Sequence, residues 1–287
     1  MIRKSLEGGD EMYSRVYIEI TNTCNMNCSF CHGHSRENRR MTLSEFSRIL
    51  DSLEGRTRHL YYHLMGEPLT HPELPTFLGL AKERGFLSQI TTNGTLLDRY
   101  GDALVEAGLH KVNISLHSFE EGGEDKFLSY LEKVASFSEM ASSRGVIVVL
   151  RLWNQGHDQG KNNLILSYLQ SHIEGEWVET TRGYRIHGKL HLEWGDRFVW
   201  PDREAPLQGE KVFCYGLRDH FGILADGTVV PCCLDSEGVI ALGNLFEESL
   251  DSILSSERAV AMVKGFGCRK ATEELCRRCG YAQRFNK

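Results

Sequence analysis

Short apolar runs and amphipathic stretches alternate between residues 16 and about 170 of this 287-residue chain. Their composition and spacing predict strands at 16–20, 59–64, 88–92, 111–116 and 146–152, and helices at 42–53, 72–85, 96–107, 125–143 and 162–172. Repeated strand–helix alternation indicates a parallel sheet with helices outside it, closed or partly closed. We therefore expect the α/β class, with functional residues where the strands end and the loops begin.

The remainder of the chain is less regular. Alternation over residues 184–200 indicates a hairpin that turns at His187-Gly188 or at Gly195-Asp196. We place a domain boundary near residue 205, which divides the chain into 1–204 and 205–287. A second hairpin is predicted at 223–230, with Asp-Gly in its turn, and a helix at 249–262.

The nine cysteines lie in two groups, with three at positions 24–31 and six from Cys214 onward. The count is odd and the first residues contain no apolar signal-peptide core, so a disulfide framework is disfavoured. Scattered buried thiols would not be divided in this way. The distribution predicts two metal sites, one near each end of the chain.

Charge and hydropathy exclude other classes of function. The net charge is −6 and the pI is about 6.1, so the basic excess expected of a general nucleic-acid binder is missing. The longest aliphatic run, residues 146–150, is too short to cross a bilayer. We expect a soluble protein of the reducing cytoplasm.

Cys24, Cys28 and Cys31 form a C-x3-C-x2-C set directly after the first predicted strand. Thiolate ligands favour an iron–sulfur cluster or zinc. Three ligands leave a fourth position open, as in reactive metal sites. The alternative is a zinc site completed by His32 or His34.

The wider pattern resembles the radical S-adenosylmethionine (SAM) superfamily. The aromatic Phe30 precedes Cys31, Met65-Gly66-Glu67-Pro68 follows the second strand as the family's Gly-Gly-Glu motif does, and Thr91-Thr92-Asn93-Gly94 ends the third. The resemblance implies a partial (β/α)6 TIM-type barrel and a [4Fe-4S] cluster on Cys24, Cys28 and Cys31. It also implies SAM contacts from Phe30, Met65, Gly66, Glu67, Asn93, Ser115, His117 and Arg151.

Cys214, Cys232, Cys276 and Cys279 supply four thiolates, enough for a fully ligated cluster or a structural zinc site. The segment resembles the SPASM/twitch extension of radical SAM enzymes, a small C-terminal α+β domain. That resemblance implies an auxiliary [4Fe-4S] cluster, and the spacing is more similar to the shorter twitch form with one cluster. Cys233 is an alternative to Cys232, and Cys268 is interpreted as a buried thiol or an extra ligand.

The resemblance implies an enzyme that reductively cleaves SAM to a 5′-deoxyadenosyl radical and abstracts hydrogen from a small molecule or from a residue of a peptide or protein. No protein nucleophile is required, so no catalytic side chain is assigned. A flavodoxin or ferredoxin is the expected electron donor. The alternatives are a non-catalytic iron–sulfur carrier or redox sensor, and a zinc-stabilised binding module. Arg36, Arg39 and Arg40 are interpreted as an exposed loop.

Overall fold

The computed structural model describes residues 12–119, 123–158, 160–209 and 211–285. Its strands are β1 (Arg15–Ile18), β2 (His59–Tyr62), β3 (Leu87–Thr92), β4 (Lys111–Ser115), β5 (Ile147–Gln155), β6 (Val178–Thr180), β7 (Gly183–His187), β8 (Leu190–Asp196), β9 (His220–Ile223), β10 (Thr228–Val230) and β11 (Gly243–Asn244). Its α-helices are α1 (Leu43–Leu53), α2 (Leu74–Glu83), α3 (Leu97–Glu106), α4 (Glu124–Ser143), α5 (Lys161–His172), α6 (Leu250–Leu254), α7 (Glu257–Gly267) and α8 (Glu274–Arg277). Three short 3-10 helices are η1 (Pro68–Thr70), η2 (Leu116–Ser118) and η3 (Gly280–Phe285).

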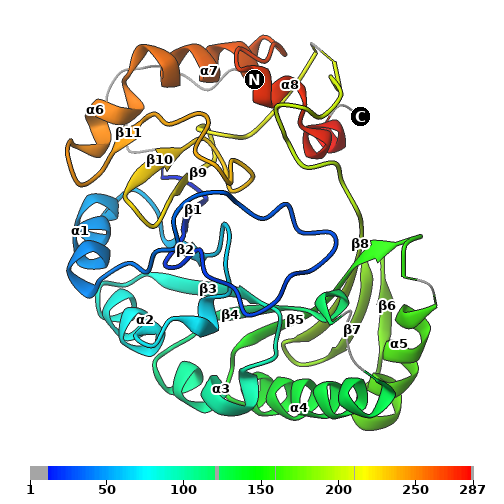
Figure 1. The fold of residues 1–287 in the computed structure, drawn as a ribbon. Coiled ribbons are helices and arrows are strands. Elements are labelled where there is room, and N and C mark those ends of the chain that lie inside the picture. Colours follow the sequence, from blue (N-terminus) through cyan, green and yellow to red (C-terminus); the bar gives the residue numbers. More distant parts are fainter. Residues whose placement is uncertain (1–11, 120–122, 159, 210, 286–287) are drawn as a thin grey trace.

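All strands belong to one curved sheet with the order β11-β10-β9-β1-β2-β3-β4-β5-β8-β7-β6. β1 to β5 and β8 run parallel to one another, and β6 and β11 form its two open edges. Helices α1 to α5 lie outside the curve (Figure 1). The predicted partial barrel is therefore confirmed, and it does not close.

The sixth parallel strand, β8, is reached through a hairpin. β7 and β8 pair antiparallel, with His187 opposite Leu190, so the predicted turn at His187-Gly188 is correct. The alternative turn at Gly195-Asp196 is wrong, because those residues end β8. β8 then pairs in parallel with β5 and completes the set.

The C-terminal segment extends the same sheet. β9 pairs in parallel with β1, and β9 and β10 form the predicted hairpin, with Gly227 at a φ of +87° in its turn. The helix predicted at 249–262 is wrong in its extent. It is two helices, α6 and α7, because the Ser256 side chain accepts a hydrogen bond from the Ala259 amide and begins a new helix.

The core lies between the outer face of the sheet and the helices. In α1, Thr42 and Glu45 form a capping box, and Phe46, Ile49, Leu50 and Leu53 are buried toward the sheet. Alternate residues of the strands, such as Val16 and Ile18, meet them from the other side. None of the described helices is long and apolar enough to cross a membrane.

Candidate cluster and cofactor sites

The loop that carries the first three cysteines is closed at its base by backbone pairing. Thr21 and Arg40 form an antiparallel bridge, and the Met41 amide donates to the Ile20 carbonyl at 2.8 Å. Within the loop, Cys24 and Cys31 are exposed and Cys28 is partly buried. The Cys28 thiol reaches the Ser118 carbonyl at 3.5 Å, which ties the loop to the end of β4.

Gly66 and Glu67 hold the backbone that leads into Cys24. The Glu67 amide donates to the Thr23 carbonyl at 2.9 Å. Gly66 has a φ of +77°, and a Cβ there would lie 2.4 Å from the Thr21 carbonyl oxygen. Only glycine fits this approach, because it has no side chain and tolerates the left-handed conformation.

The Glu67 side chain is buried and links this turn to β3. Its carboxylate accepts hydrogen bonds from the Leu69 amide at 3.0 Å, the Thr92 hydroxyl at 2.7 Å and the Asn93 amide at 2.7 Å. Burial raises the pKa of Glu67 to about 7, although these three hydrogen bonds act in the opposite direction. Glu67 is thus a structural connection between the ends of β2 and β3.

Asn93 continues this connection to the cysteine loop. Its side-chain amide donates to the side-chain oxygen Oδ1 of Asn25 at 2.9 Å, and its own side-chain oxygen accepts from the Thr95 amide and hydroxyl. Asn25 in turn donates to the Thr95 hydroxyl at 2.8 Å. The side chains of Asn93 and Asn25 therefore set the position of the segment between Cys24 and Cys28.

Glu19, just beyond β1, anchors the far side of the loop. Its fully buried carboxylate pairs with Arg36 at 2.7 Å and accepts from the Met65 and Ala225 amides at 3.3 Å each. Arg36 also donates to the Ser236 carbonyl at 2.7 Å. Arg36 is therefore not part of a freely exposed loop, as its sequence context suggested. It joins the cysteine loop to the C-terminal segment.

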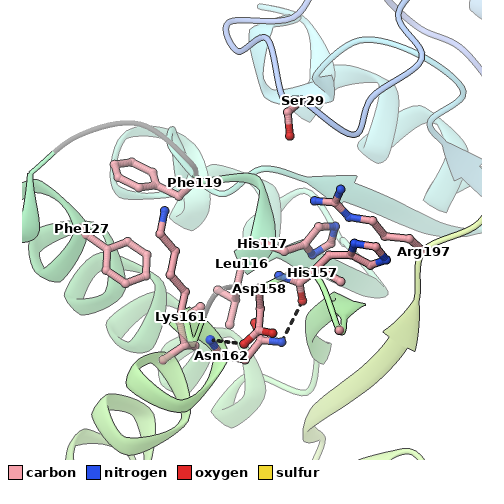
Figure 2. Close-up of a pocket in the computed structure, with 13 residues that line it drawn as sticks. Ser29, Leu116, His117, Phe119, Phe127, His157, Asp158, Lys161, Asn162 and Arg197 are labelled. Atoms are coloured by element: carbon pink, nitrogen blue, oxygen red, sulfur yellow. Dashed lines mark hydrogen bonds between the residues drawn. The ribbon is translucent and has the colours of Figure 1, made fainter.

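A cavity of about 610 Å³ lies beside the cysteine loop, past the carboxyl ends of β4 and β5. Its lining residues are Ser29, Leu116, His117, Phe119, Phe127, Asn154, Gly156, His157, Asp158, Lys161, Asn162, Ile165 and Arg197. Figure 2 shows Ser29 projecting from the cysteine loop toward Asp158, Lys161 and Asn162 on the opposite wall. Ligand sites in proteins commonly have this size and this place in the sheet.

The polar end of the cavity is held by local hydrogen bonds. The Asn162 side chain donates to Asn154 at 2.9 Å, and the Asn162 amide donates to the Asp158 carboxylate at 3.2 Å. The side-chain oxygen Oδ1 of Asn162 is buried and has no hydrogen-bond partner among the described residues. The cavity thus presents both apolar side chains and polar groups, as small-molecule sites commonly do.

Of the residues predicted to contact SAM, only His117 lines this cavity. Phe30 packs against His117, with 4.8 Å between the ring centroids, and the Arg197 guanidinium lies 5.7 Å from the Phe30 ring. Ser115 lies opposite Arg151 on the neighbouring strands β4 and β5. Met65, Gly66, Glu67 and Asn93 also lie at strand ends, but the contacts described above join them to the cysteine loop and to the residues that hold it.

The C-terminal cysteines converge from distant positions. Burial raises the pKa of Cys232, and its neighbours Cys233, Cys214, Cys279 and Cys276 raise it further. Burial likewise raises the pKa of the Cys214 thiol to about 11. Four partly buried thiols that lie close together suit a soft metal centre, which would deprotonate them.

The two remaining cysteines differ from each other. Cys233 is also buried close to Cys232, and its thiol interacts with the Tyr17 hydroxyl on β1. Cys268 is exposed at the end of α7, so its interpretation as a buried thiol is wrong. Neither is needed to complete a set of four.

The zinc alternatives find no support in the geometry. His32 lies 3.4 Å from the Asp202 carboxylate and stacks on Trp200, and His34 is hydrogen-bonded to the Asn22 carbonyl. No three His, Cys, Asp or Glu side chains of the described residues surround a single ion position. A cluster spreads its cysteine ligands over several iron atoms, so the two cysteine sets fit a cluster better than one ion.

Sequence reasoning missed two features of this region. The polar residue Asn154 lies near the end of β5, and Asp158 and Asn162 follow the strand, where the rule for strand ends could have indicated them. The Glu19–Arg36 pair had no local signal, because it joins two residues that become neighbours only when the loop folds back.

Comparisons with known families agree with this geometry. The family model of the radical SAM superfamily matches residues 18–153, and that of the SPASM iron–sulfur cluster-binding domain matches residues 214–280. Together the two models cover the cysteine loop, the parallel strands up to β5 and the second cysteine group.

The curated relatives match only part of their length. A GTP 3′,8-cyclase from Chlorobaculum tepidum is 37% identical over 118 residues, which are 40% of this chain and 35% of the relative. The chain therefore spans about a third of the length of this curated relative.

Solved structures match almost the whole chain at low identity. The structure of BtrN in complex with AdoMet and 2-DOIA has a TM-score of 0.61 at 18% identity and covers 94% of each chain. Streptococcus suis SuiB bound to the precursor peptide SuiA has a TM-score of 0.61 at 15% identity, covering 95% of this chain and 70% of that one. The chain belongs to the radical SAM superfamily and carries a SPASM iron–sulfur cluster-binding domain at its C-terminal end.

Proposed function

We propose that this enzyme reductively cleaves SAM at a [4Fe-4S] cluster held by Cys24, Cys28 and Cys31 and abstracts a hydrogen atom from its substrate. When bound, the cluster and SAM supply the 5′-deoxyadenosyl radical. One observation carries the proposal: Ser29, between two of these cysteines, also lines the 610 Å³ cavity. A simple electron carrier needs no cavity of this size beside its cluster.

We place the nucleoside part of SAM in this cavity. His117 and Phe30 would pack along it, and Asn154 and Asp158 would face its polar groups. Ser115 and Arg151, opposite each other on β4 and β5, are our candidates for its carboxylate.

The turn after β2 is assigned to the amino group of SAM and to the positioning of the cysteine loop. The backbone of Met65 and Gly66 would meet the amino group of SAM. Glu67 and Asn93 act as positioning residues, because their side chains are already used to hold the cysteine loop.

We assign one auxiliary [4Fe-4S] cluster to Cys214, Cys232, Cys276 and Cys279. The mutual proximity of these four partly buried thiols supports the assignment. With four cysteine ligands no coordination position remains for a substrate, which favours a role in electron transfer. We also keep the division at residue 205, which falls in the segment between β8 and β9.

The substrate class of the proposal is a small molecule or a residue of a peptide. The similar structures include a complex of each kind, BtrN with 2-DOIA and SuiB with the precursor peptide SuiA. The electron would come from a flavodoxin or ferredoxin. A reducing cytoplasm suits nine cysteines that are all free thiols.

The test is the formation of 5′-deoxyadenosine and methionine from SAM by the anaerobically reconstituted, dithionite-reduced protein. We expect both products from the wild type and neither from Cys28→Ala. The control is Cys268→Ala, which removes an exposed thiol outside both sets and should cleave SAM at the wild-type rate. Equal cleavage by wild type and Cys28→Ala would refute the assignment.

A further inference from the structure

The outer face of the barrel is apolar, whereas the inner face carries charged and aromatic side chains beside a small apolar cluster of Tyr17, Leu64, Leu224 and Val230. On β1, Val16 and Ile18 are fully buried against the helices, while Arg15 and Tyr17 point to the other face. β4 likewise begins with Lys111 on the inner face. The interior of a complete α/β barrel is usually filled by branched apolar side chains, so this open barrel departs from that pattern.

Aromatic and imidazole rings gather around Tyr17 on this face. Its ring centroid lies 5.4 Å from Tyr61, 5.3 Å from His63 and 5.6 Å from His220. The Arg15 guanidinium lies 5.6 Å from the Tyr61 ring. The rings therefore line a surface that brings β1, β2 and β9 together.

Three cations, Arg15, Lys111 and Arg151, face the same space, and the carboxylate of Glu193 acts on two of them, Lys111 and Arg151. Burial lowers the pKa of Lys111, and the positive charges of Arg151 and Arg15 add to this, whereas Glu193 opposes it. Within the described residues, no ion pair joins Arg15, Lys111 or Arg151 to a carboxylate. The concentration of cations is notable in a chain whose net charge is −6.

Several buried nitrogen atoms of this face have no hydrogen-bond partner. They are Arg15 Nε, His63 Nδ1, Arg151 Nε and His220 Nδ1. Buried polar atoms in native proteins are almost always paired, so four unpaired ones in one place need an explanation. Burial and the charge of nearby arginines lower the pKa of His63 to about 3 and that of His220 to about 4, so both rings are neutral at pH 7.

We propose that Arg15 and Lys111 bind the anionic group, a phosphate or a carboxylate, of a small-molecule substrate on the inner face of the sheet. This proposal names the substrate class and so rests on the proposed function. The oxygen atoms of such an anionic group would accept hydrogen bonds from the unpaired nitrogen atoms, and its negative charge would balance the cations. The other end of the substrate would then point along the strands toward the cysteine loop.

The dimensions favour a small, elongated molecule. Lys111 begins β4 and Ser115 ends it, so about 13 Å of strand separates the anchor from the SAM side of the barrel. The long side chains of Lys111 and Arg15 shorten the distance that the substrate must span.

The test is calorimetric titration of the reconstituted protein with inorganic pyrophosphate and, separately, with malonate. We expect at least one probe to bind, and Lys111→Gln and Arg15→Gln each to weaken its binding at least tenfold, as the loss of a charge-assisted hydrogen bond does. The matched control is Lys264→Gln, an exposed charge on α7, which should bind like the wild type. The probe that binds distinguishes a phosphate from a carboxylate.

A second measurement separates a binding site from a structural one. Unpaired buried cations oppose folding, so Lys111→Gln should raise the urea midpoint of the ligand-free protein. A lower midpoint, no binding of either probe, or equal binding by wild type and both variants would overturn the proposal. Probe binding without SAM cleavage would refute the proposed function alone, and SAM cleavage without probe binding would refute this inference alone.

Discussion

Replacing Gly66 by alanine tests whether the turn after β2 sets the position of the first cluster cysteine. The new Cβ would lie 2.4 Å from the Thr21 carbonyl oxygen and within 3 Å of two backbone atoms of Asn22. A left-handed conformation costs a non-glycine residue about 1–2 kcal/mol, and overpacking costs about 1–3 kcal/mol. Because the contacted atoms are backbone, they cannot swing aside. We expect a loss of about 2–5 kcal/mol, or a displaced loop.

The assay combines urea denaturation, followed by circular dichroism, with the iron content after anaerobic reconstitution. Gly66→Ala should lower the denaturation midpoint and reduce iron at the first site. Gly79→Ala is the matched control, since Gly79 lies inside α2 with nothing within 4 Å of an added Cβ, and alanine there favours the helix. If Gly66→Ala matched the wild type in both midpoint and iron content, the close approach would have no structural role.

Three further predictions concern Glu67, Arg36 and Cys268. Glu67 keeps its proton to a higher pH in the folded state than in the unfolded one, because burial raises its pKa. The free energy of unfolding should therefore fall by about 3 kcal/mol as the pH rises from 4.5 to 7. The urea midpoint of Glu67→Gln should lack this dependence on pH. Arg36→Met leaves the buried Glu19 unpaired and should cost about 3–5 kcal/mol in urea denaturation, whereas Arg40→Met, in the same loop but exposed, should cost little. Cys268→Ser should retain the wild-type iron and sulfide content, and a loss of iron would place Cys268 in the auxiliary set.

The parallel barrel was predictable because each of its elements carries a local signal. The strands of the barrel are short β-branched or aromatic runs, and α1 begins at a capping box that can be read directly from Thr42 and Glu45. The three motifs at the ends of the first three strands also lie together in space, as the rule for carboxyl ends of parallel strands requires.

The parts that escaped prediction depend on long-range contacts or on a local signal that is hidden in the sequence. The pairing of β9 with β1 joins His220 to Arg15 across most of the chain, and no local pattern announces it. The break between α6 and α7 rests on Ser256, whose capping signal is masked by a continuous amphipathic pattern. The inner-face cations come from separate strands, so their proximity appears only once the sheet is curved.

The most direct test of two cluster sites is the iron and sulfide content per chain after strictly anaerobic reconstitution, compared between wild type, Cys24→Ala and Cys232→Ala. We predict about eight iron atoms with matching sulfide in the wild type and about four in each variant, because each substitution removes one four-iron cluster. Zinc in place of iron would contradict the account, and so would a Cys232→Ala variant that kept all of its iron.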